Sequence, residues 1–191
     1  MTFRLGYVTG ATPDKWARVW RERQREGIAL VPLEEPGQEA PLRAGEVDMA
    51  LVRLPVDRDG LHCIPLYEER PVVVLGTEHV LTLADEVSPD DLAGEQLVLP
   101  ERSGWTPSAA QLEWPAMTER DAVEVAASGG GVAIVPMSIA RLHHRKDVTF
   151  RPVTGLPGTT VGLAWLVEND DARVQTFIGI VRGRTANSSR G

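Results

Sequence analysis

Cysteine and long apolar segments are nearly absent from this sequence. Its 191 residues include one cysteine, Cys63, which has no partner for an intrachain disulfide. No window approaches the ~20 apolar residues of a membrane span, and the N-terminus enters a strand-like segment without a secretion signal. No Cys or His cluster has the spacing of metal ligands. We therefore expect a cytoplasmic protein without a metal, a cofactor or a membrane association.

Positive charge is also scarce. The chain has 27 acidic and 20 basic residues, a formal net charge of −7 and a pI of about 5.1. Proteins that grip phosphate backbones carry the opposite balance, so we expect no direct nucleic-acid binding by this chain. The hydrophobic content of 42% suffices for one ordinary domain or two small lobes.

Recognisable catalytic motifs are missing too. The sequence has no G-x-S-x-G, H-E-x-x-H or Walker loop, and no G-x-G-x-x-G after a strand. The triplet Gly129–Gly131 lies between a predicted helix and a predicted strand, the reverse of a phosphate loop, and is interpreted as a helix C-cap. His143 and His144 are interpreted as a solvated pair near a helix end rather than zinc ligands. We assign no catalytic residue.

Strand-like and helical patterns alternate along the chain. Strands are predicted at 3–8, 28–33, 47–52, 61–67, 70–76, 96–100, 132–136, 148–153 and 159–167. Helices are predicted at 12–26, 35–45, 108–114 and 118–128, and after Asn169, and 88–94 is interpreted as a capped helical turn. Thr12 and Asn169 are the expected N-caps, and Thr118 with Asp121 resembles a capping box. Such alternation favours a parallel sheet covered by helices, and 185–191 is expected to be a frayed tail.

Four segments occur in an order that resembles the effector-binding domain of LysR-type transcriptional regulators. They are FRLGYVTGATP, LRAGEVDMALVRLPVDRDGLHCIPLYEERPVVVL, VSPDDLAGEQLVL and GGGVAIVPMSIAR, and together they cover almost the whole chain. The resemblance implies an α/β fold like that of type 2 periplasmic binding proteins, with two lobes, two crossing strands and a small-molecule effector in the cleft. Lobe I is expected at 1–75 and 155–191, and lobe II at 76–154.

The resemblance is incomplete at the N-terminus. Family members usually begin with a winged helix-turn-helix domain and a linker helix, whereas Met1 stands two residues before the first predicted strand. We expect either an excised domain or a stand-alone sensor. The family also implies a homodimer in which helices of opposite lobes meet, and helix 12–26 with Trp16 and Trp20 is a candidate contributor.

Two features of lobe I favour binding of an anion. Thr9, Gly10, Ala11 and Thr12 follow the first strand and lead into a helix N-terminus, where free N–H groups attract negative charge. Arg53 ends the third strand, whose carboxyl end reaches the same crevice in a doubly wound lobe. A guanidinium and amide donors suit a carboxylate, so we expect a small organic acid. The alternative for Arg53 is a surface ion pair with Asp57 or Asp59.

Lobe II is implied by the resemblance to contribute contacts from the loop after 96–100, from a helix start and from the end of 132–136. These residues are Arg102, Ser103, Gly104, Trp105, Thr118, Val135 and Pro136. Trp105 could supply a flat wall for an unsaturated acid or could simply pack against the core. The rival interpretation of the whole chain is an enzyme acting on a small carboxylic acid on the same scaffold.

Overall fold

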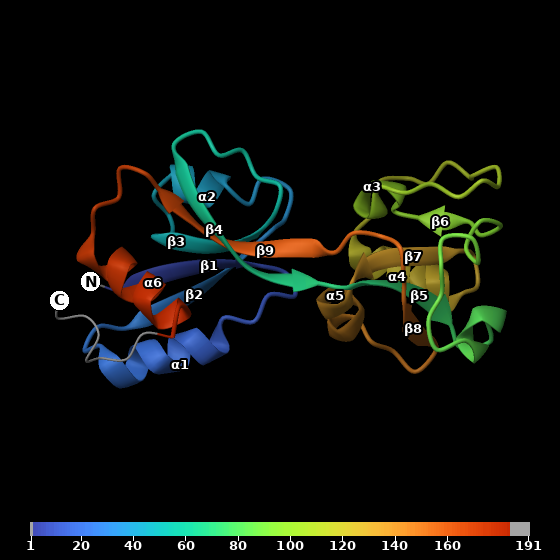
Figure 1. Cartoon of the computed structure of the whole chain (residues 1–191), viewed down its shortest axis with the longest axis horizontal. Coiled ribbons are helices and arrows are strands. Elements are labelled where there is room, and N and C mark those ends of the chain that lie inside the picture. The colour runs from blue at the N-terminus through green and yellow to red at the C-terminus, as the bar shows by residue number, and fades with distance from the viewer. Residues whose placement is uncertain (1, 184–191) are drawn as a thin grey trace. The chain divides into compact units, whose positions relative to one another are not determined.

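A computed structural model describes residues 2–183 of the chain (Figure 1). Among these residues, those up to Tyr67 and those from Thr160 to Gly183 form one compact unit, and Glu68–Thr159 form the other. The chain passes between the units near the end of β4 (Leu61–Glu69) and again at the start of β9 (Thr159–Leu166). The sequence placed these boundaries after residues 75 and 154.

The first unit is built on a five-stranded sheet with the order β2-β1-β3-β9-β4. Strands β1 (Phe3–Val8), β2 (Ile28–Leu33) and β3 (Met49–Arg53) are parallel, and β9 runs antiparallel to β3. The buried strand β3 contributes residues to both faces, as expected for a sheet covered on two sides.

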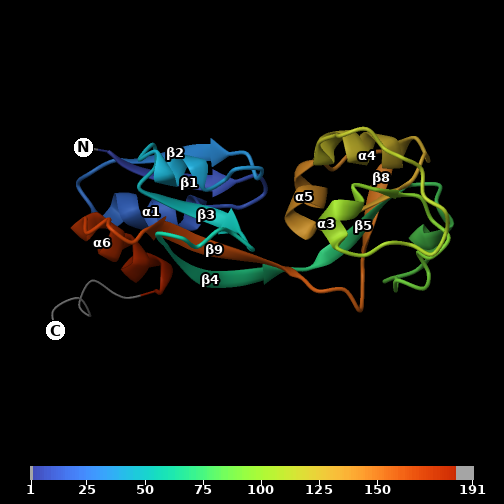
Figure 2. The same cartoon turned by 90° about the horizontal axis from the view of Figure 1, so that it is seen from above.

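Helices cover both faces of this first sheet. Helices α1 (Asp14–Arg23) and α6 (Ala172–Val181) lie side by side on one face, as Figures 1 and 2 show, and the short helix α2 (Ala40–Arg43) packs on the other through Leu42. The rings of Phe3, Trp20 and Phe177 pack at centroid distances of 4.6 to 5.9 Å. These aromatic contacts fix α1 and α6 to β1.

The second unit has a four-stranded mixed sheet with the order β6-β7-β5-β8. Strand β5 (Pro71–Gly76) pairs antiparallel with β7 (Val132–Pro136) and β8 (Val148–Pro152), and the two-residue strand β6 (Leu97–Val98) is parallel to β7. Its helical elements are η1 (Val80–Leu83), α3 (Pro100–Ser103), α4 (Glu119–Ala127) and α5 (Met137–Leu142). Because β5 lies in this sheet, residues 71–75 pack with the second unit.

Local signals at helix ends were correct in some places and wrong in others. The capping box of Thr118 and Asp121 is confirmed, and Gly129 ends α4 with a φ of 76°. Thr12 is not the N-cap of α1, because the helix is preceded by Pro13 and has no side-chain cap. Asn169 is not the N-cap of α6, because Asp171 accepts the hydrogen bond from the Arg173 N–H.

The interpretation of 88–94 as a capped helical turn agrees with the structure, in which residues 89–94 form turns and Ser88 and Asp91 exchange capping-type hydrogen bonds. The helix predicted at 108–114 is not formed. Residues 108–114 are irregular, because the side chain of Gln111 accepts from the Leu97 N–H at 2.7 Å and donates to Glu95 O. The side-chain amide of Gln111 therefore bonds to the backbone along the edge of β6, and the segment that carries it is not helical. The predicted tail 185–191 lies outside the described residues.

Candidate effector-binding site

The loop after β1 makes a tight turn into α1. Gly10 has a φ of 85°, and the Ala11 N–H donates to Val8 O at 3.0 Å. Thr9 and Gly10 are half-buried, Ala11 is buried and Thr12 is exposed. Helix α1 begins directly after Pro13 without a side-chain cap. An acceptor would therefore be favoured near the first-turn N–H groups of α1.

Arg53 lies at the carboxyl end of β3, on the strand adjacent to β1. The parallel register pairs Tyr7 with Leu51, so Thr9 and Arg53 are each two residues beyond this pair. The structure thus brings the predicted loop and the predicted arginine to the same edge of one sheet, which is where ligands of open α/β sheets bind.

The Arg53 side chain is only 1% exposed and forms an ion pair with Glu35, with Nη1 2.9 Å from Oε2. The alternative of a surface ion pair with Asp57 or Asp59 was wrong because Arg53 is buried, and Asp57 pairs with Arg43. The backbone of Arg53 is bonded to the Gln38 side chain, whose Oε1 accepts from the Arg53 N–H at 2.8 Å and whose Nε2 donates to Arg53 O at 2.7 Å. The Gln38 side chain therefore satisfies the backbone N–H and C=O of Arg53, as a neighbouring strand would.

The loop 34–39 was missed as part of this region. Within this loop the Glu35 side chain is 20% exposed and contacts a buried guanidinium. No sequence pattern predicts the contact between Glu35 and Arg53, which are 18 positions apart. A buried cation at a strand end nevertheless requires an anionic partner.

In the second unit, α3 and the start of α4 are joined by an ion pair. Arg102 Nη2 lies 2.6 Å from Glu119 Oε1, with both side chains mostly buried. Glu119 follows Thr118, whose hydroxyl accepts from the Asp121 N–H at 3.2 Å. The hydrogen bonds from Thr118 lower the pKa of the Asp121 carboxyl, which keeps this cap anionic. Arg102 and Thr118 are therefore brought to one end of α4.

Ser103 and Trp105 stabilise the turn that follows α3. The Ser103 hydroxyl is 2.9 Å from Trp105 O and 3.2 Å from the Trp105 N–H, and Gly104 between them has a φ of 63°. The Trp105 ring is partly buried and packs against the core that contains Val73 and Leu75. Packing against this core therefore covers part of the Trp105 ring.

Val135 and Pro136 end strand β7 and are both buried. They pair with Val72 and Pro71 of β5, and Val135 belongs to the core of α4. Helix α3 packs beside β7, so these backbone positions lie close to α3. Any contact of Val135 with a ligand would be made by its backbone.

Metal and thiol chemistry have little support in the described residues. No group of three His, Cys, Asp or Glu within 2–183 is arranged to hold a metal ion. Burial raises the pKa of the Cys63 thiol, which disfavours the nucleophilic thiolate. Among the same residues, no helix combines the length and the apolar character needed to cross a bilayer.

Two α/β units, each with its own sheet and joined by two passages of the chain, define the type 2 periplasmic-binding-protein class. The LysR substrate binding domain matches residues 17–186, and the chain belongs to this family of domains of transcriptional regulators. The fold class and family suggested by the sequence motifs are confirmed.

Comparison with known proteins agrees with this assignment. The chain is 29% identical over 202 residues to the Hca operon transcriptional activator HcaR of Escherichia coli K12, covering 96% of this chain and 68% of HcaR. The reduced form of OxyR has a similar structure, with a TM-score of 0.78, 17% identity and coverage of 99% and 98%. The BenM effector-binding domain with its effector benzoate gives a TM-score of 0.75 at 18% identity, with coverage of 95% and 90%.

Proposed function

We propose that this chain senses a small organic acid and that binding, rather than turnover, is its contribution to transcription regulation. The observation that carries the proposal is the carboxyl edge of the first sheet. There the Arg53 guanidinium holds a carboxylate at 2.9 Å beside the loop that enters α1. A carboxylate ligand suits this position, because guanidinium and carboxylate groups match in shape and charge.

Each unit contributes its own group of proposed contacts. In the first unit these are Thr9–Thr12 and Arg53, and in the second they are Arg102, Ser103, Trp105, Thr118, Val135 and Pro136. Both arginines are paired with a glutamate of their own unit, Arg53 with Glu35 and Arg102 with Glu119. An incoming carboxylate would replace or join these internal acids. The benzoate bound by BenM supports an organic acid as the class of effector.

The experiment is a thermal-shift screen of small aliphatic and aromatic acids with the purified chain. An acid present at a hundred times its Kd should stabilise the protein by about 2.7 kcal/mol. For a protein of this size that corresponds to a rise in Tm of about 5 to 10 °C. The absence of any acid-dependent shift across the screen would count against the proposal.

A non-catalytic role is part of the same proposal, since the relative HcaR is a transcriptional activator. The alternative is an enzyme that consumes a small carboxylic acid. Incubation of the chain with each stabilising acid, followed by chromatography, separates the two. An unchanged acid supports sensing, and a product that accumulates with time supports the enzyme.

We also propose a cytoplasmic homodimer that does not bind DNA through this chain. The net charge of −7 opposes DNA binding, and the family resemblance supports pairing of two copies. Trp16 and Trp20 do not contribute a free surface, because they are 8% and 1% exposed in the core of the first unit. Sedimentation velocity and titration with duplex DNA test these statements.

A further inference from the structure

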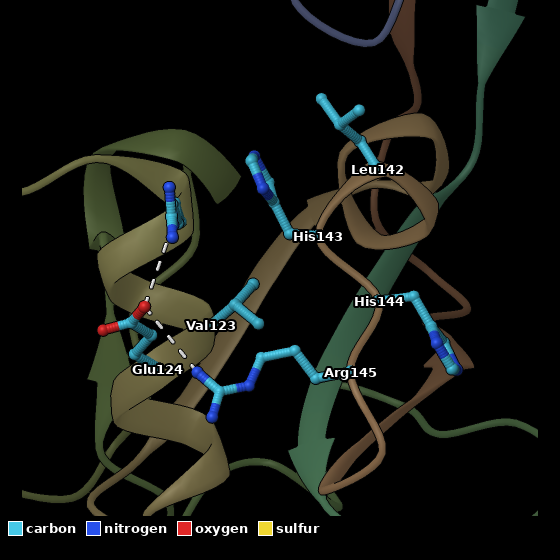
Figure 3. A pocket seen from close by; sticks show the side chains of 7 residues that line it. Val123, Glu124, Leu142, His143, His144 and Arg145 are labelled. Carbon is cyan, nitrogen blue, oxygen red and sulfur yellow. Dashed lines mark ion pairs between the residues drawn. The ribbon is translucent and has the colours of Figure 1, made fainter.

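The second unit contains a pocket between α4 and the segment that follows α5 (Figure 3). Its volume is about 490 Å³, in the size range of small-molecule sites. The lining residues are Arg120, Val123, Glu124, Leu142, His143, His144 and Arg145. None of them belongs to the proposed effector contacts.

Two guanidinium groups converge on one carboxylate oxygen in this pocket. Glu124 Oε1 lies 3.8 Å from Arg120 Nε and 3.7 Å from Arg145 Nη1. Both separations exceed hydrogen-bond length, and the Glu124 side chain is 51% exposed. Glu124 is therefore a weakly held anion that can move into solvent.

Arg145 is oriented by a second acid outside the pocket lining. Asp147 accepts from Arg145 through two contacts of 3.0 Å, from Nε to Oδ1 and from Nη2 to Oδ2. This pair lowers the pKa of the Asp147 carboxyl and fixes the plane of the guanidinium. In Figure 3 the Arg145 side chain extends towards Glu124, so its remaining Nη1 group faces the pocket.

The pocket combines local positive charge with apolar surface. Its lining places the two guanidiniums of Arg120 and Arg145 against the one carboxylate of Glu124, in a chain with a net charge of −7. Figure 3 shows His143 standing between α4 and α5. Val123 and the exposed side chain of Leu142 supply apolar atoms on the two walls.

We propose that this pocket binds a small organic phosphate monoester. The phosphate takes the place of Glu124 between Arg120 and Arg145, and the organic group lies against Leu142. A phosphate is favoured over a single carboxylate because it carries up to two charges and three acceptor oxygens for two separate guanidiniums. The site is distinct from the proposed carboxylate contacts and does not depend on them.

The test is calorimetric titration of the whole chain with phenyl phosphate at low salt. Binding should saturate at one ligand per chain, and phenol, which lacks the anion, should not bind. Arg145→Gln and Arg120→Gln should each weaken binding about tenfold through loss of a charged partner. Glu124→Gln should tighten it about threefold, because it removes the internal competitor.

Arg18→Gln is the matched control. Arg18 and Glu22 form an i,i+4 pair on α1 at 3.9 Å, with side chains 75% and 63% exposed, which closely reproduces the Arg120–Glu124 pair. The affinity of the Arg18→Gln variant for phenyl phosphate should equal that of the unmodified chain. The proposal is overturned if the unmodified chain shows no saturable binding, if Arg18→Gln weakens binding as much as Arg120→Gln, or if Glu124→Gln weakens it.

Discussion

The ion pair between Arg53 and Glu35 should contribute to stability far more than an ordinary surface pair. Its side chains are 1% and 20% exposed, so little water is available to replace the carboxylate when it is removed. Exposed pairs contribute about 0 to 1 kcal/mol, and breaking a buried pair costs about 3 to 5 kcal/mol. Because Glu35 retains some contact with solvent, we expect Glu35→Gln to cost about 2 to 3 kcal/mol.

A double-mutant cycle isolates the interaction itself. Urea unfolding would be measured for Glu35→Gln, Arg53→Met and the double variant, and the coupling free energy should be about 2 kcal/mol. The cycle of Arg18→Met with Glu22→Gln is the control, because that pair is exposed on both sides and should couple by less than about 0.5 kcal/mol.

The result that would refute this reasoning is a coupling free energy for the Arg53–Glu35 pair no larger than that of the control pair. The burial of Arg53 means that its replacement by alanine should affect stability as well as ligand affinity. Because the side chain is 1% exposed, Arg53→Ala also leaves a cavity and lowers the stability of the first unit.

Three further substitutions test the packing and capping of the second unit. Gly131→Ala places a Cβ 2.6 Å from the backbone oxygen of Gln96, and chemical denaturation should show a loss of about 1 to 3 kcal/mol. Gly158→Ala places a Cβ against Glu68 Oε1, the end of a flexible exposed side chain, so it should cost less than Gly131→Ala; an equal or larger cost for Gly158→Ala would contradict this ranking. Thr118→Ala should lower stability by about 1 kcal/mol through loss of the cap, and an unchanged urea midpoint would show that the capping box contributes nothing.

The strands were predictable because each is a short apolar segment bounded by turn residues. The run Met49–Val52 is buried on both faces, as its continuous apolar sequence indicated. The capping box at Thr118 was predictable for a similar reason, since its bonds join residues three positions apart. Local patterns are thus reliable where the stabilising contact is itself local.

The partners of the candidate site could not be predicted from local patterns. Gln38 bonds to the backbone of Arg53, and Gln111 bonds to the backbone of Leu97, 15 and 14 residues away in sequence. Both contacts depend on how a loop folds back on a strand, which no periodicity encodes. The same is true of Glu35, whose carboxylate reaches Arg53 only after the loop 34–39 has folded.

We propose that the chain recognises the charge of a small carboxylate. The most direct measurement is calorimetric titration with the acid that gives the largest thermal shift and, separately, with its neutral primary amide of the same shape. We expect the acid to bind saturably, one per chain, and the amide to bind at least about thirtyfold more weakly, because a desolvated charge pair contributes about 2 to 5 kcal/mol. Equal affinities for the acid and the amide would contradict it.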